Sequence, residues 1–302
     1  MDFGKLQDIS KVDFTLPADN PFTAQTLAVA PKVSKPELYF GPPIWANKDW
    51  IGKIYPSNAK DKDFLYYYTR QFNTIELNVT HYQIPTSKTV ERWKESAADG
   101  FKFCPKFPQA ISHDRQLIGC EFLTEQFCEA ILGLGDHLGM TFLQLAPTFD
   151  PRRLKSLEAF LKQLPKGFPV SVEFRHQDWF SDKNIWAKTC EMLAELNVGT
   201  VISDVSGRRD VLHTTLTIPK LTLRFVGNEL HPTDYTRVDD WCERLKKWLD
   251  AGLNSAFIFV HCGENEFAPE LTKYWINTIN AKYRLAIKEP KIMPQAVQGS
   301  LF

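Results

Sequence analysis

The segment Ser171–Trp179 carries an acid, a guanidinium and an imidazole side chain within four residues, at Glu173, Arg175 and His176. Its apolar residues alternate with Glu173 and Arg175, as they do along a strand whose two faces differ. Charged side chains at the end of a strand are a costly choice for a core. The segment therefore predicts part of a catalytic or binding site.

Other short apolar runs place polar side chains in the same way when a period of two is applied to each run. Glu76 alternates with Ile75 and Leu77, and Arg224 alternates with Leu223. The carboxyl ends of parallel strands meet at one edge, where the active sites of barrel enzymes lie. The predicted ring of polar residues at this edge comprises Glu76, Asn78, Lys106, Gln144, Glu173, Arg175, Asp204, Arg224 and His261.

Two carboxylates at one mouth can divide acid and base roles, as they do in glycoside and isomerase chemistry. Glu173 and Glu76 are therefore the acid–base candidates, and His176 or His113 is expected to shuttle a proton. The alternative is structural, because paired charges can neutralise each other inside a barrel. Burying so many charges for stability alone is costly, which favours a site. His261, a lone histidine beside a buried strand, is more often a satisfied core residue.

Cations and aromatic residues around the mouth indicate what the site binds. Arg175, Arg224 and Lys106 suit a phosphate or carboxylate group. Aromatic rings beside planar donors suit a sugar or a base that is stacked and held at its edges, although such rings also pack loops against a barrel. The remaining predicted substrate-binding residues are Asn78, Tyr82, Gln144, Asp204 and Trp45.

No cofactor is predicted. The sequence has no Walker loop, no G-x-G-x-x-G and no G-x-S-x-G motif, which argues against nucleotide cofactors and serine hydrolases. Glu76, Glu173, Asp204 and a histidine are a conceivable ligand set for a divalent metal. However, H-x-H and H-E-x-x-H spacings are absent, and arginines and a lysine share the ring. A metal is therefore the less favoured alternative.

Eight short apolar runs alternate with amphipathic stretches from residue 37 onward. The runs are Leu38–Gly41, Thr74–Asn78, Phe101–Lys106, Thr141–Leu145, Pro169–Arg175, Thr200–Asp204, Leu221–Phe225 and Ala256–Cys262. The amphipathic stretches are Lys62–Gln71, Ser87–Ala98, Glu121–His137, Arg152–Leu164, Lys183–Leu196, Tyr235–Ala251 and Glu270–Leu285. Eight strands with crossovers predict an α/β fold of the (β/α)8 TIM barrel type. No convincing helix follows the sixth run, before Leu221.

The predicted barrel is a single domain with an addition at each end. Residues 1–36 are polar and proline-punctuated and are expected to form an N-terminal extension on the surface of the domain. The barrel is expected to occupy residues 37–287. Residues 288–302, rich in Pro and Gln, are expected to form a flexible C-terminal tail.

Composition excludes several classes of function. Lys plus Arg and Asp plus Glu both total 36 among 302 residues, so the net charge is zero, which argues against broad binding to nucleic acid or anionic membrane. The six cysteines show no C-x-x-C spacing and are expected to be reduced thiols. No apolar run approaches the length of a membrane span, and no apolar leader stands at the N-terminus. A cytoplasmic protein is therefore expected.

Four segments resemble the YecE-like family, domain of unknown function 72 (DUF72). They are Phe72–Tyr82, Thr89–Trp93, Gly100–Lys106 together with Ile111–His113, and Val172–His176 together with Trp179. The resemblance runs from about Tyr39 to Tyr283 and implies a TIM-type barrel, but it implies no established activity. The positions that coincide with the family's motif residues are Glu76, Asn78, Tyr82, Lys106, His113, Glu173, Arg175 and His176.

The sequence departs from the family pattern at two strand ends. After the first strand the family tends to show Gly-x-Ser-Gly-Trp, whereas this chain has Gly41-Pro-Pro-Ile-Trp45. At the eighth strand the family tends to show an aromatic residue followed by Asn-Asn, whereas this chain has Val260-His-Cys-Gly263. These departures put a role for the eighth strand in doubt.

The sequence favours an enzyme, a hydrolase, lyase or isomerase, that acts on a small anionic or sugar-like substrate without a nucleotide cofactor. A second hypothesis concerns the final residues Gln298-Gly-Ser-Leu301-Phe302, which resemble the pentapeptide that bacterial proteins use to dock on the sliding clamp. It makes the protein a DNA-maintenance or nucleic-acid-binding accessory. A non-catalytic, ligand-binding barrel is the third hypothesis.

Overall fold

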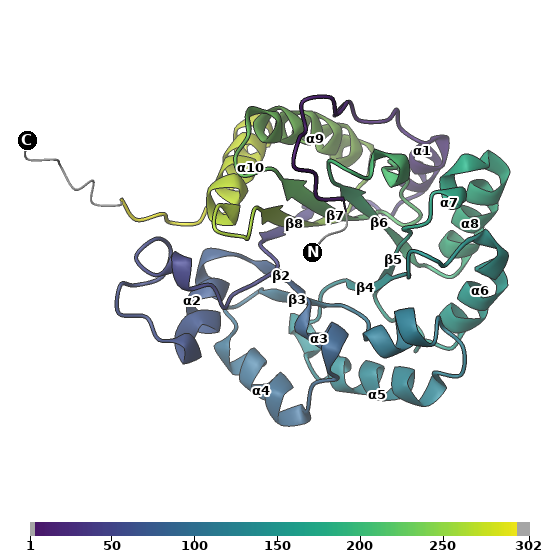
Figure 1. Cartoon of the computed structure of the whole chain (residues 1–302), viewed down its shortest axis with the longest axis horizontal. Helices are drawn as coiled ribbons and strands as arrows, with labels where there is room; N and C mark the ends of the chain where they lie inside the picture. The colour runs from purple at the N-terminus through teal and green to yellow at the C-terminus, as the bar shows by residue number, and fades with distance from the viewer. Residues whose placement is uncertain (1–3, 295–302) are drawn as a thin grey trace, which may run out of the picture.

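The computed structural model describes residues 4–294, which form eight parallel strands with helices around them (Figure 1). The strands are β1 (Glu37–Gly41), β2 (Thr74–Leu77), β3 (Lys102–Pro105), β4 (Thr141–Gln144), β5 (Val170–Glu173), β6 (Gly199–Asp204), β7 (Lys220–Gly227) and β8 (Ser255–Cys262). Each coincides with one of the eight apolar runs. The strand prediction is confirmed, with differences of one or two residues at the ends.

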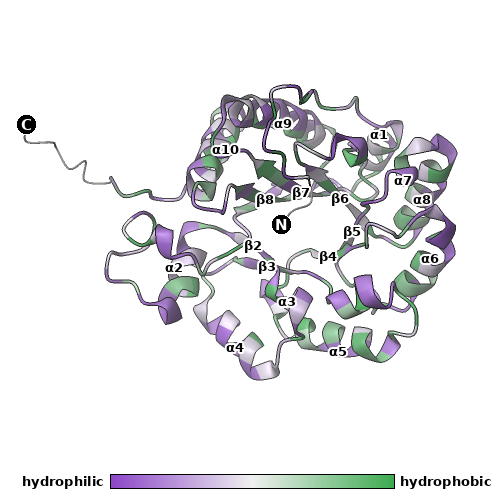
Figure 2. Ribbon diagram, in the orientation of Figure 1, coloured by the Kyte–Doolittle hydropathy of each residue, from purple (hydrophilic) through white to green (hydrophobic). Residues whose placement is uncertain are grey.

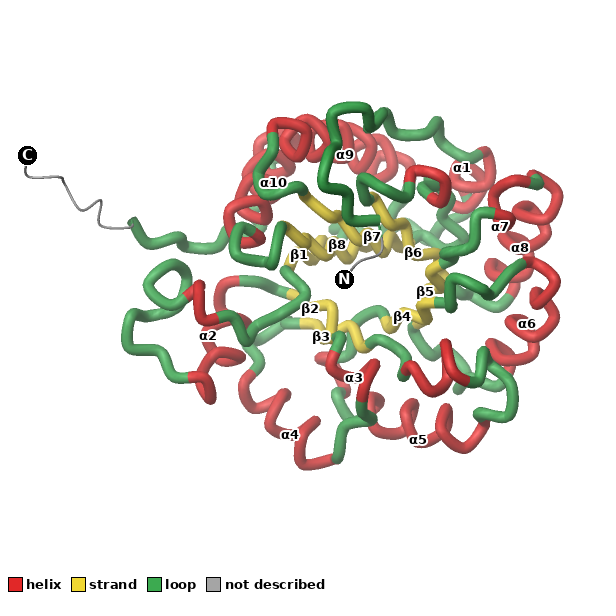
Figure 3. The backbone as a smooth tube through the Cα atoms, viewed as in Figure 1, coloured by secondary structure: helices red, strands yellow, loops and turns green. Residues whose placement is uncertain are grey.

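The strands form two hydrogen-bonded sheets. Six follow the order β1-β8-β7-β6-β5-β4, and β2 pairs with β3. Isolated parallel bridges join the two sheets on one side, between Phe103 and Leu138 and between Lys106 and Phe142. Figure 3 shows the strands in yellow, succeeding one another around a common centre with most helices outside. The α/β fold with a six-stranded parallel sheet is thus established, whereas the ladder of hydrogen bonds is not continuous around the ring.

A side-chain amide replaces the backbone ladder between β1 and β2. Asn73 accepts a hydrogen bond from the Phe40 backbone N–H at 2.7 Å and donates one to the Leu38 carbonyl at 2.9 Å. The two strands come very close, because a Cβ atom at Gly41 would lie 1.9 Å from the Thr74 carbonyl oxygen. Only glycine therefore fits at the end of β1.

Helices surround the strands. They are α1 (Pro21–Ala28), α2 (Phe64–Gln71), α3 (Val79–Tyr82), α4 (Ser87–Ser96), α5 (Glu121–Leu132), α6 (Leu154–Lys162), α7 (Asp178–Ser181), α8 (Lys183–Glu195), α9 (Pro232–Ala251) and α10 (Ala268–Tyr283). Figure 2 shows that they carry both hydrophilic and hydrophobic residues, as amphipathic helices do. All seven predicted amphipathic stretches are helical in the structure.

Alternation along the strands divides the apolar residues into two groups. Residues such as Leu221 and Leu223 of β7 belong to the main core, together with the buried faces of the helices. A second, smaller cluster comprises Tyr39, Cys104, Met140, Ile218, Phe257 and Phe259. Its strand residues point to the same side of their strands as Glu76, Glu173 and Arg224 do. The Tyr39 and Phe257 rings stack with centroids 4.7 Å apart. The charged residues therefore share the enclosed side of the strands with this apolar cluster.

The N-terminal segment is more than a surface extension. Thr23 of α1 is buried, donates a hydrogen bond to the Thr214 carbonyl at 2.8 Å and accepts one from Leu216 N–H at 2.9 Å. Between β6 and β7 the described structure has only a short 3-10 turn, Arg209–Val211, as the missing helical pattern predicted. Figure 1 shows α1 beside α9 on the outside of the ring. The N-terminal helix thus covers a part of the fold that the connection after β6 leaves without a helix of its own.

Candidate functional site

Two buried glutamates are held by one arginine at the carboxyl ends of the strands. Glu76 of β2 and Glu173 of β5 are 0% and 1% exposed. Arg224 of β7 donates Nε to Glu76 Oε2 at 2.9 Å and Nη2 to Glu76 Oε1 at 3.0 Å. Its Nη1 atom donates to both carboxylate oxygens of Glu173, at 3.1 and 3.3 Å. Arg224 thus joins into one network two glutamates that lie far from it in the sequence, Glu76 at a separation of 148 positions and Glu173 at a separation of 51.

Further donors complete the coordination of each carboxylate. Glu76 accepts hydrogen bonds from Asn78 Nδ2 at 2.8 Å and from His261 Nε2 at 3.0 Å. Glu173 accepts from a side chain on each neighbouring strand and from one that follows its own strand. These donors are Gln144 Nε2 at 2.7 Å, Ser203 Oγ at 2.8 Å and Arg175 Nε at 3.2 Å.

The network keeps both carboxylates ionised. Burial alone would raise the pKa of Glu76, but Arg224 and His261 outweigh it and hold the pKa well below the usual value. Burial is outweighed in the same way at Glu173, whose pKa is lowered by Arg175 and Arg224. Burial works against the charge of Arg224 as well, but the two glutamates raise the pKa of this residue. A carboxyl group with a lowered pKa is a poor general acid, because it carries no proton near pH 7.

Lys106, which directly follows β3, has a different environment. Its side chain is buried, with 4% of the residue exposed, and Nζ lies 6.0 Å from the centroid of the Phe142 ring. Among residues 4–294, no hydrogen bond or ion pair reaches this ammonium group. The pKa of Lys106 is lowered to about 8, mainly by burial and also by the charges of Arg224 and Arg175, whereas the two glutamates oppose the shift.

Two histidines lie next to this lysine on the side of α3 and of the loop after β3. The rings of His81 and His113 have centroids 5.2 Å apart. Burial lowers the pKa of both imidazoles, that of His81 to about 4, and the charge of Lys106 acts in the same direction. Both histidines are therefore neutral near pH 7. The exposed Tyr82 ring packs edge-on against His81.

Hydrogen bonds fix the tautomer of each histidine. Nδ1 of His81 lies 2.8 Å from the Phe107 carbonyl oxygen, which can only accept, so Nδ1 carries the proton. Nδ1 of His113 lies 2.8 Å from Ser112 Oγ, whose own hydrogen is donated to the Pro108 carbonyl. Nδ1 of His113 is therefore also the donor. Each imidazole keeps an unprotonated Nε2 that can accept a proton.

The structure brings most of the predicted site residues together. Glu76, Asn78, Gln144, Glu173, Arg175, Arg224 and His261 are joined by hydrogen bonds, and Lys106 and His113 lie next to them. Tyr82 is 79% exposed and reaches the group only through its contact with His81.

Three predicted site residues lie elsewhere. Nδ1 of His176 accepts a hydrogen bond from the backbone N–H of its neighbour Asp178 at 3.2 Å. Trp45 packs edge-on against Trp93, at a centroid distance of 6.4 Å, and accepts a hydrogen bond from Tyr55 at its carbonyl. Within residues 4–294, no hydrogen bond or ion pair joins the side chain of either residue to the network. The third is Asp204.

The predicted position of Asp204 in the ring is wrong. Ser203 of β6 points to Glu173, so the next residue, Asp204, points to the opposite face. There it accepts hydrogen bonds from Arg237 at 2.8 Å and from Trp241 Nε1 at 2.6 Å, both on α9, and also pairs with Arg209. Asp204 therefore fastens α9 to the sheet.

Two residues of the site were not among the predicted ones. Ser203 is the β6 residue that faces inward, and alternation could not have distinguished it from Asp204 because both faces of β6 are buried. His81 lies on α3, where a period of two has no meaning, so no strand pattern could have found it. His261 was included in the predicted ring as its weaker member, since a lone histidine is more often a core residue, and in the structure its imidazole binds Glu76.

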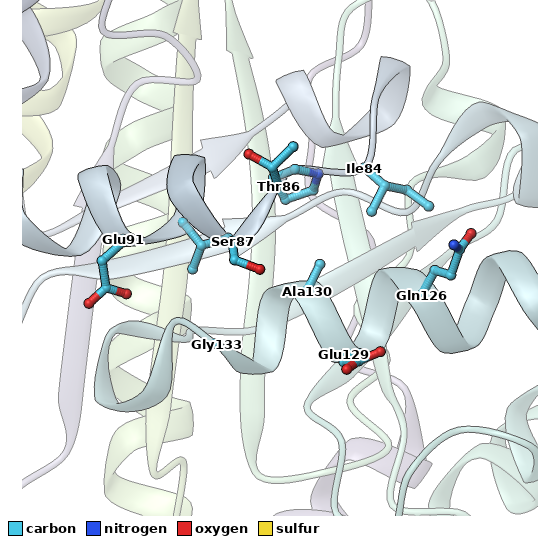
Figure 4. Close-up of a pocket in the computed structure, with 10 residues that line it drawn as sticks. Ile84, Thr86, Ser87, Glu91, Gln126, Glu129, Ala130 and Gly133 are labelled. Atoms are coloured by element: carbon cyan, nitrogen blue, oxygen red, sulfur yellow. The ribbon is translucent and has the colours of Figure 1, made fainter.

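A surface depression lies away from these charges. It has a volume of about 630 Å³ and is formed by the start of α4, with Thr86, Ser87 and Glu91, and by α5, with Gln126 and Glu129 (Figure 4). None of the predicted site residues lines it. The network of buried charges at the carboxyl ends of the strands is therefore separate from this depression.

Residues 4–294 contain no group of three or more His, Cys, Asp or Glu side chains arranged to hold a metal ion. In the same range, no helix combines the length and the apolar character that a membrane crossing requires.

The fold and the network define a class: a parallel α/β protein with a buried ion network at the carboxyl ends of its strands. Within that class the chain belongs to the family described as protein of unknown function DUF72, whose model matches residues 39–296. The resemblance predicted from the four motif segments is confirmed.

Relatives and solved structures agree with this membership. The UPF0759 protein YecE of Escherichia coli K12 is 30% identical over 281 residues, which cover 87% of this chain and 98% of YecE. The UPF0759 protein YunF of Bacillus subtilis is 28% identical over 153 residues, 48% of this chain and 52% of YunF. Crystal structures of DUF72 family proteins from Enterococcus faecalis and Thermotoga maritima are similar, with TM-scores of 0.65 and 0.61 at 18% and 22% identity. The match to the Enterococcus faecalis structure covers 84% of this chain and 100% of that chain, and the match to the Thermotoga maritima structure covers 82% of this chain and 99% of that chain. The two structures support the fold and leave the reaction open.

Proposed function

We propose that this protein is an enzyme that carries out acid–base chemistry on a small anionic or sugar-like substrate at the carboxyl ends of its strands, as a hydrolase, lyase or isomerase. The observation that carries the proposal is Lys106. This lysine is buried, its ammonium group has no hydrogen bond or ion pair among the described residues, and its pKa is lowered to about 8. A lysine that titrates near neutral pH can both donate and accept a proton, and perturbed groups of this kind gather at functional sites.

The glutamates have a supporting role in this proposal. Glu76 and Glu173 stay ionised and bind Arg224 from two sides, so that its guanidinium group is held in one orientation. Glu173 also binds Arg175, which is 7% exposed. These two glutamates are positioning residues rather than proton donors, a change from the roles expected from the sequence. Lys106 and the neutral His113 and His81 are the groups suited to move protons.

Charge balance favours an anionic substrate. Among residues 4–294, Arg175 and Arg224 form ion pairs with Glu173 and Glu76, whereas the ammonium group of Lys106 forms none. A buried group of charges with an excess cation is stabilised by an anion that supplies the missing partner. Arginine and lysine side chains are also the groups that bind carboxylates and phosphates in proteins.

We further propose that the eight strands close into a (β/α)8 barrel of the TIM type. The bridges between β3 and β4, and Asn73 between β1 and β2, lie where the two hydrogen-bonded sheets adjoin. Contacts across the ring support closure as well: Glu76 of β2 binds Arg224 of β7, and the Phe142 ring of β4 lies 6.3 Å from the Phe259 ring of β8. Active sites of such barrels lie at the carboxyl ends of the strands.

A ligand screen with two lysine variants tests the proposal. Lys106→Met removes the unpaired ammonium group, whereas Lys102→Met, on the same strand, removes a lysine that donates to the Asp136 carbonyl outside the network. Thermal unfolding is measured with phosphate, small carboxylates, sugars and sugar phosphates, because a ligand that binds only the folded state raises the melting temperature. We expect anionic compounds to stabilise the wild type and Lys102→Met but not Lys106→Met.

Conversion of the stabilising compound is then followed by chromatography. Turnover by the wild type and its loss in Lys106→Met are the expected results. Binding without turnover supports the non-catalytic, ligand-binding barrel instead. Equal stabilisation of both variants by every anion contradicts the proposed role of Lys106.

The sliding-clamp hypothesis concerns a different part of the chain. Gln298, Leu301 and Phe302, the residues expected to dock, lie outside the described residues, and docking stays a prediction from the sequence. The described chain reaches residue 294, and the backbone N–H of Met293 donates to the Lys53 carbonyl at 2.7 Å.

A further inference from the structure

The backbone around Lys106 is fixed on both sides. Its own N–H donates to the Leu77 carbonyl at 3.3 Å, and its carbonyl accepts a hydrogen bond from Thr80 Oγ1 at 2.7 Å. A parallel bridge joins it to Phe142 of β4. The stem of the side chain therefore starts from a rigid point, which is the arrangement that a reacting group requires.

The surroundings of Nζ favour the neutral amine. Nζ of Lys106 lies 6.0 Å from the centroid of the Phe142 ring. A second cation, the guanidinium group of Arg224, lies 5.8 Å from the same centroid. Apolar surfaces and neighbouring cations both disfavour the ammonium form, and desolvation next to another cation is an established way to activate a lysine as a nucleophile. With a pKa of about 8, roughly one molecule in ten carries the neutral amine at pH 7.

Proton acceptors stand close to this amine. Nε2 of His81 and Nε2 of His113 are unprotonated, since Nδ1 of each ring is the donor in its hydrogen bond. Both imidazoles are neutral near pH 7 because burial and the charge of Lys106 lower the pKa of each. Such groups can take a proton from a reacting intermediate and return it.

We propose that Lys106 is the nucleophile of this site and forms an imine with the carbonyl carbon of a small anionic aldehyde or ketone. This proposal rests on the proposed function, of which it specifies the substrate class. The lone pair of Nζ attacks the carbonyl carbon, a carbon–nitrogen bond forms, and the carbonyl π electrons move to oxygen, which takes up a proton. The resulting carbinolamine loses its hydroxyl group as water, after a second proton transfer, and the carbon–nitrogen double bond forms. The net change is one ammonium and one carbonyl giving one protonated imine and one water.

The imine narrows the reaction class. A protonated imine draws electrons from the neighbouring bonds, so that a carbon–hydrogen or carbon–carbon bond next to it breaks more easily. These are the steps of isomerases and lyases, and they need a base, for which His113 and His81 are the candidates because the charge of Lys106 acts on both. Hydrolysis of an ester or glycoside gains nothing from an imine, so the hydrolase is the least favoured of the three classes.

Reductive trapping tests the proposal. The protein is incubated with glyoxylate, pyruvate or glyceraldehyde 3-phosphate and then with sodium borohydride, which reduces an imine to a stable secondary amine. Peptide mass spectrometry locates the adduct. We expect it on Lys106 at pH 7, with Lys102 unmodified, and we expect the rate of trapping to rise with pH up to an apparent pKa of about 8. Lactate, which has no carbonyl carbon that can form an imine, is expected to leave no adduct.

Lys106→Arg separates anion binding from the covalent step. This variant keeps a positive charge but cannot form an imine, so the stabilisation by lactate and pyruvate is expected to persist while the adduct at position 106 is lost. Urea unfolding shows whether the variant remains folded. If anions stabilise the wild type and no carbonyl compound in the panel is trapped on Lys106, the imine is wrong and the proposed anion site stands. If neither stabilisation nor trapping occurs, both proposals fail.

Discussion

Replacing Arg224 by methionine removes a side chain that binds both buried glutamates. In the variant, Glu76 keeps Asn78 and His261 as partners, and Glu173 keeps Arg175, Gln144 and Ser203. Removing one partner of a buried ion pair costs about 3–5 kcal/mol, because the remaining charge is left without compensation in a medium of low dielectric constant. With an m-value of about 3 kcal/mol/M, we expect the urea midpoint to fall by about 1–2 M.

A surface ion pair supplies the matched control. Arg152 pairs with Asp150, but its side chain is 90% exposed. Exposed pairs contribute about 0–1 kcal/mol, since water and salt screen them. Arg152→Met is therefore expected to unfold at nearly the same urea concentration as the wild type. An equal loss of stability in the two variants would refute the argument from burial.

The pH dependence of the stability of wild type and Arg224→Met tests the same role of Arg224. In the wild type, the pKa of each glutamate is lower in the folded than in the unfolded state. The stabilisation is therefore complete above the unfolded value of about 4.3 and is lost as the pH falls through the folded values. In Arg224→Met, burial is no longer outweighed at Glu76, and the pKa of Glu76 is expected to rise. The gap between wild type and variant should then be larger at pH 8 than at pH 5, and an equal gap at both values contradicts this account.

A second substitution identifies the cause of the loss. Adding Glu76→Gln to Arg224→Met removes the uncompensated charge while keeping a side chain of similar size. We expect the double variant to recover part of the stability at pH 7, because neutral groups cost less to bury than a charge. If the double variant is less stable than Arg224→Met alone, the ionised carboxylate is not the source of the destabilisation.

Two further predictions concern the ends of the chain. Thr23→Ala removes a buried hydroxyl that binds the Thr214 carbonyl and Leu216 N–H, and should cost about 1–3 kcal/mol in urea unfolding; no measurable loss would mean that α1 is not part of the cooperative fold. Deletion of residues 298–302 is expected to abolish capture of the protein by an immobilised bacterial sliding clamp, and capture that survives the deletion contradicts clamp docking.

The fold was predictable from the sequence because its signals are local. Each strand is a short apolar run, and each of the seven predicted helices has an amphipathic pattern that a period of 3.6 reveals. The contact of α1 with the connection after β6 was not predictable in this way. It depends on hydrogen bonds between Thr23 and residues about 190 positions away, which no local pattern encodes.

The site was predictable where the strand alternation is clear, and not elsewhere. Glu76, Glu173 and Arg224 alternate with large apolar residues, so their common face follows from the period of two. The β6 segment reads Thr-Val-Ile-Ser-Asp, and both of its faces are buried, so that the pattern does not show which of Ser203 and Asp204 faces inward. Only the observed contact of Ser203 with Glu173 decides it.

The charges of the site connect the proposed ligand with the proposed chemistry. Among residues 4–294, the ion pairs of Arg175 and Arg224 are with Glu173 and Glu76, and no carboxylate pairs with the protonated Lys106. An anion that enters restores the balance but raises the pKa of Lys106, which favours the ammonium and opposes nucleophilic attack. A protonated imine resolves this conflict, because it keeps one positive charge at Nζ beside the anionic group of the same molecule. An anionic carbonyl compound thus satisfies the electrostatics of this site both before and after the covalent bond forms, whereas a neutral one supplies no partner to the Lys106 ammonium group.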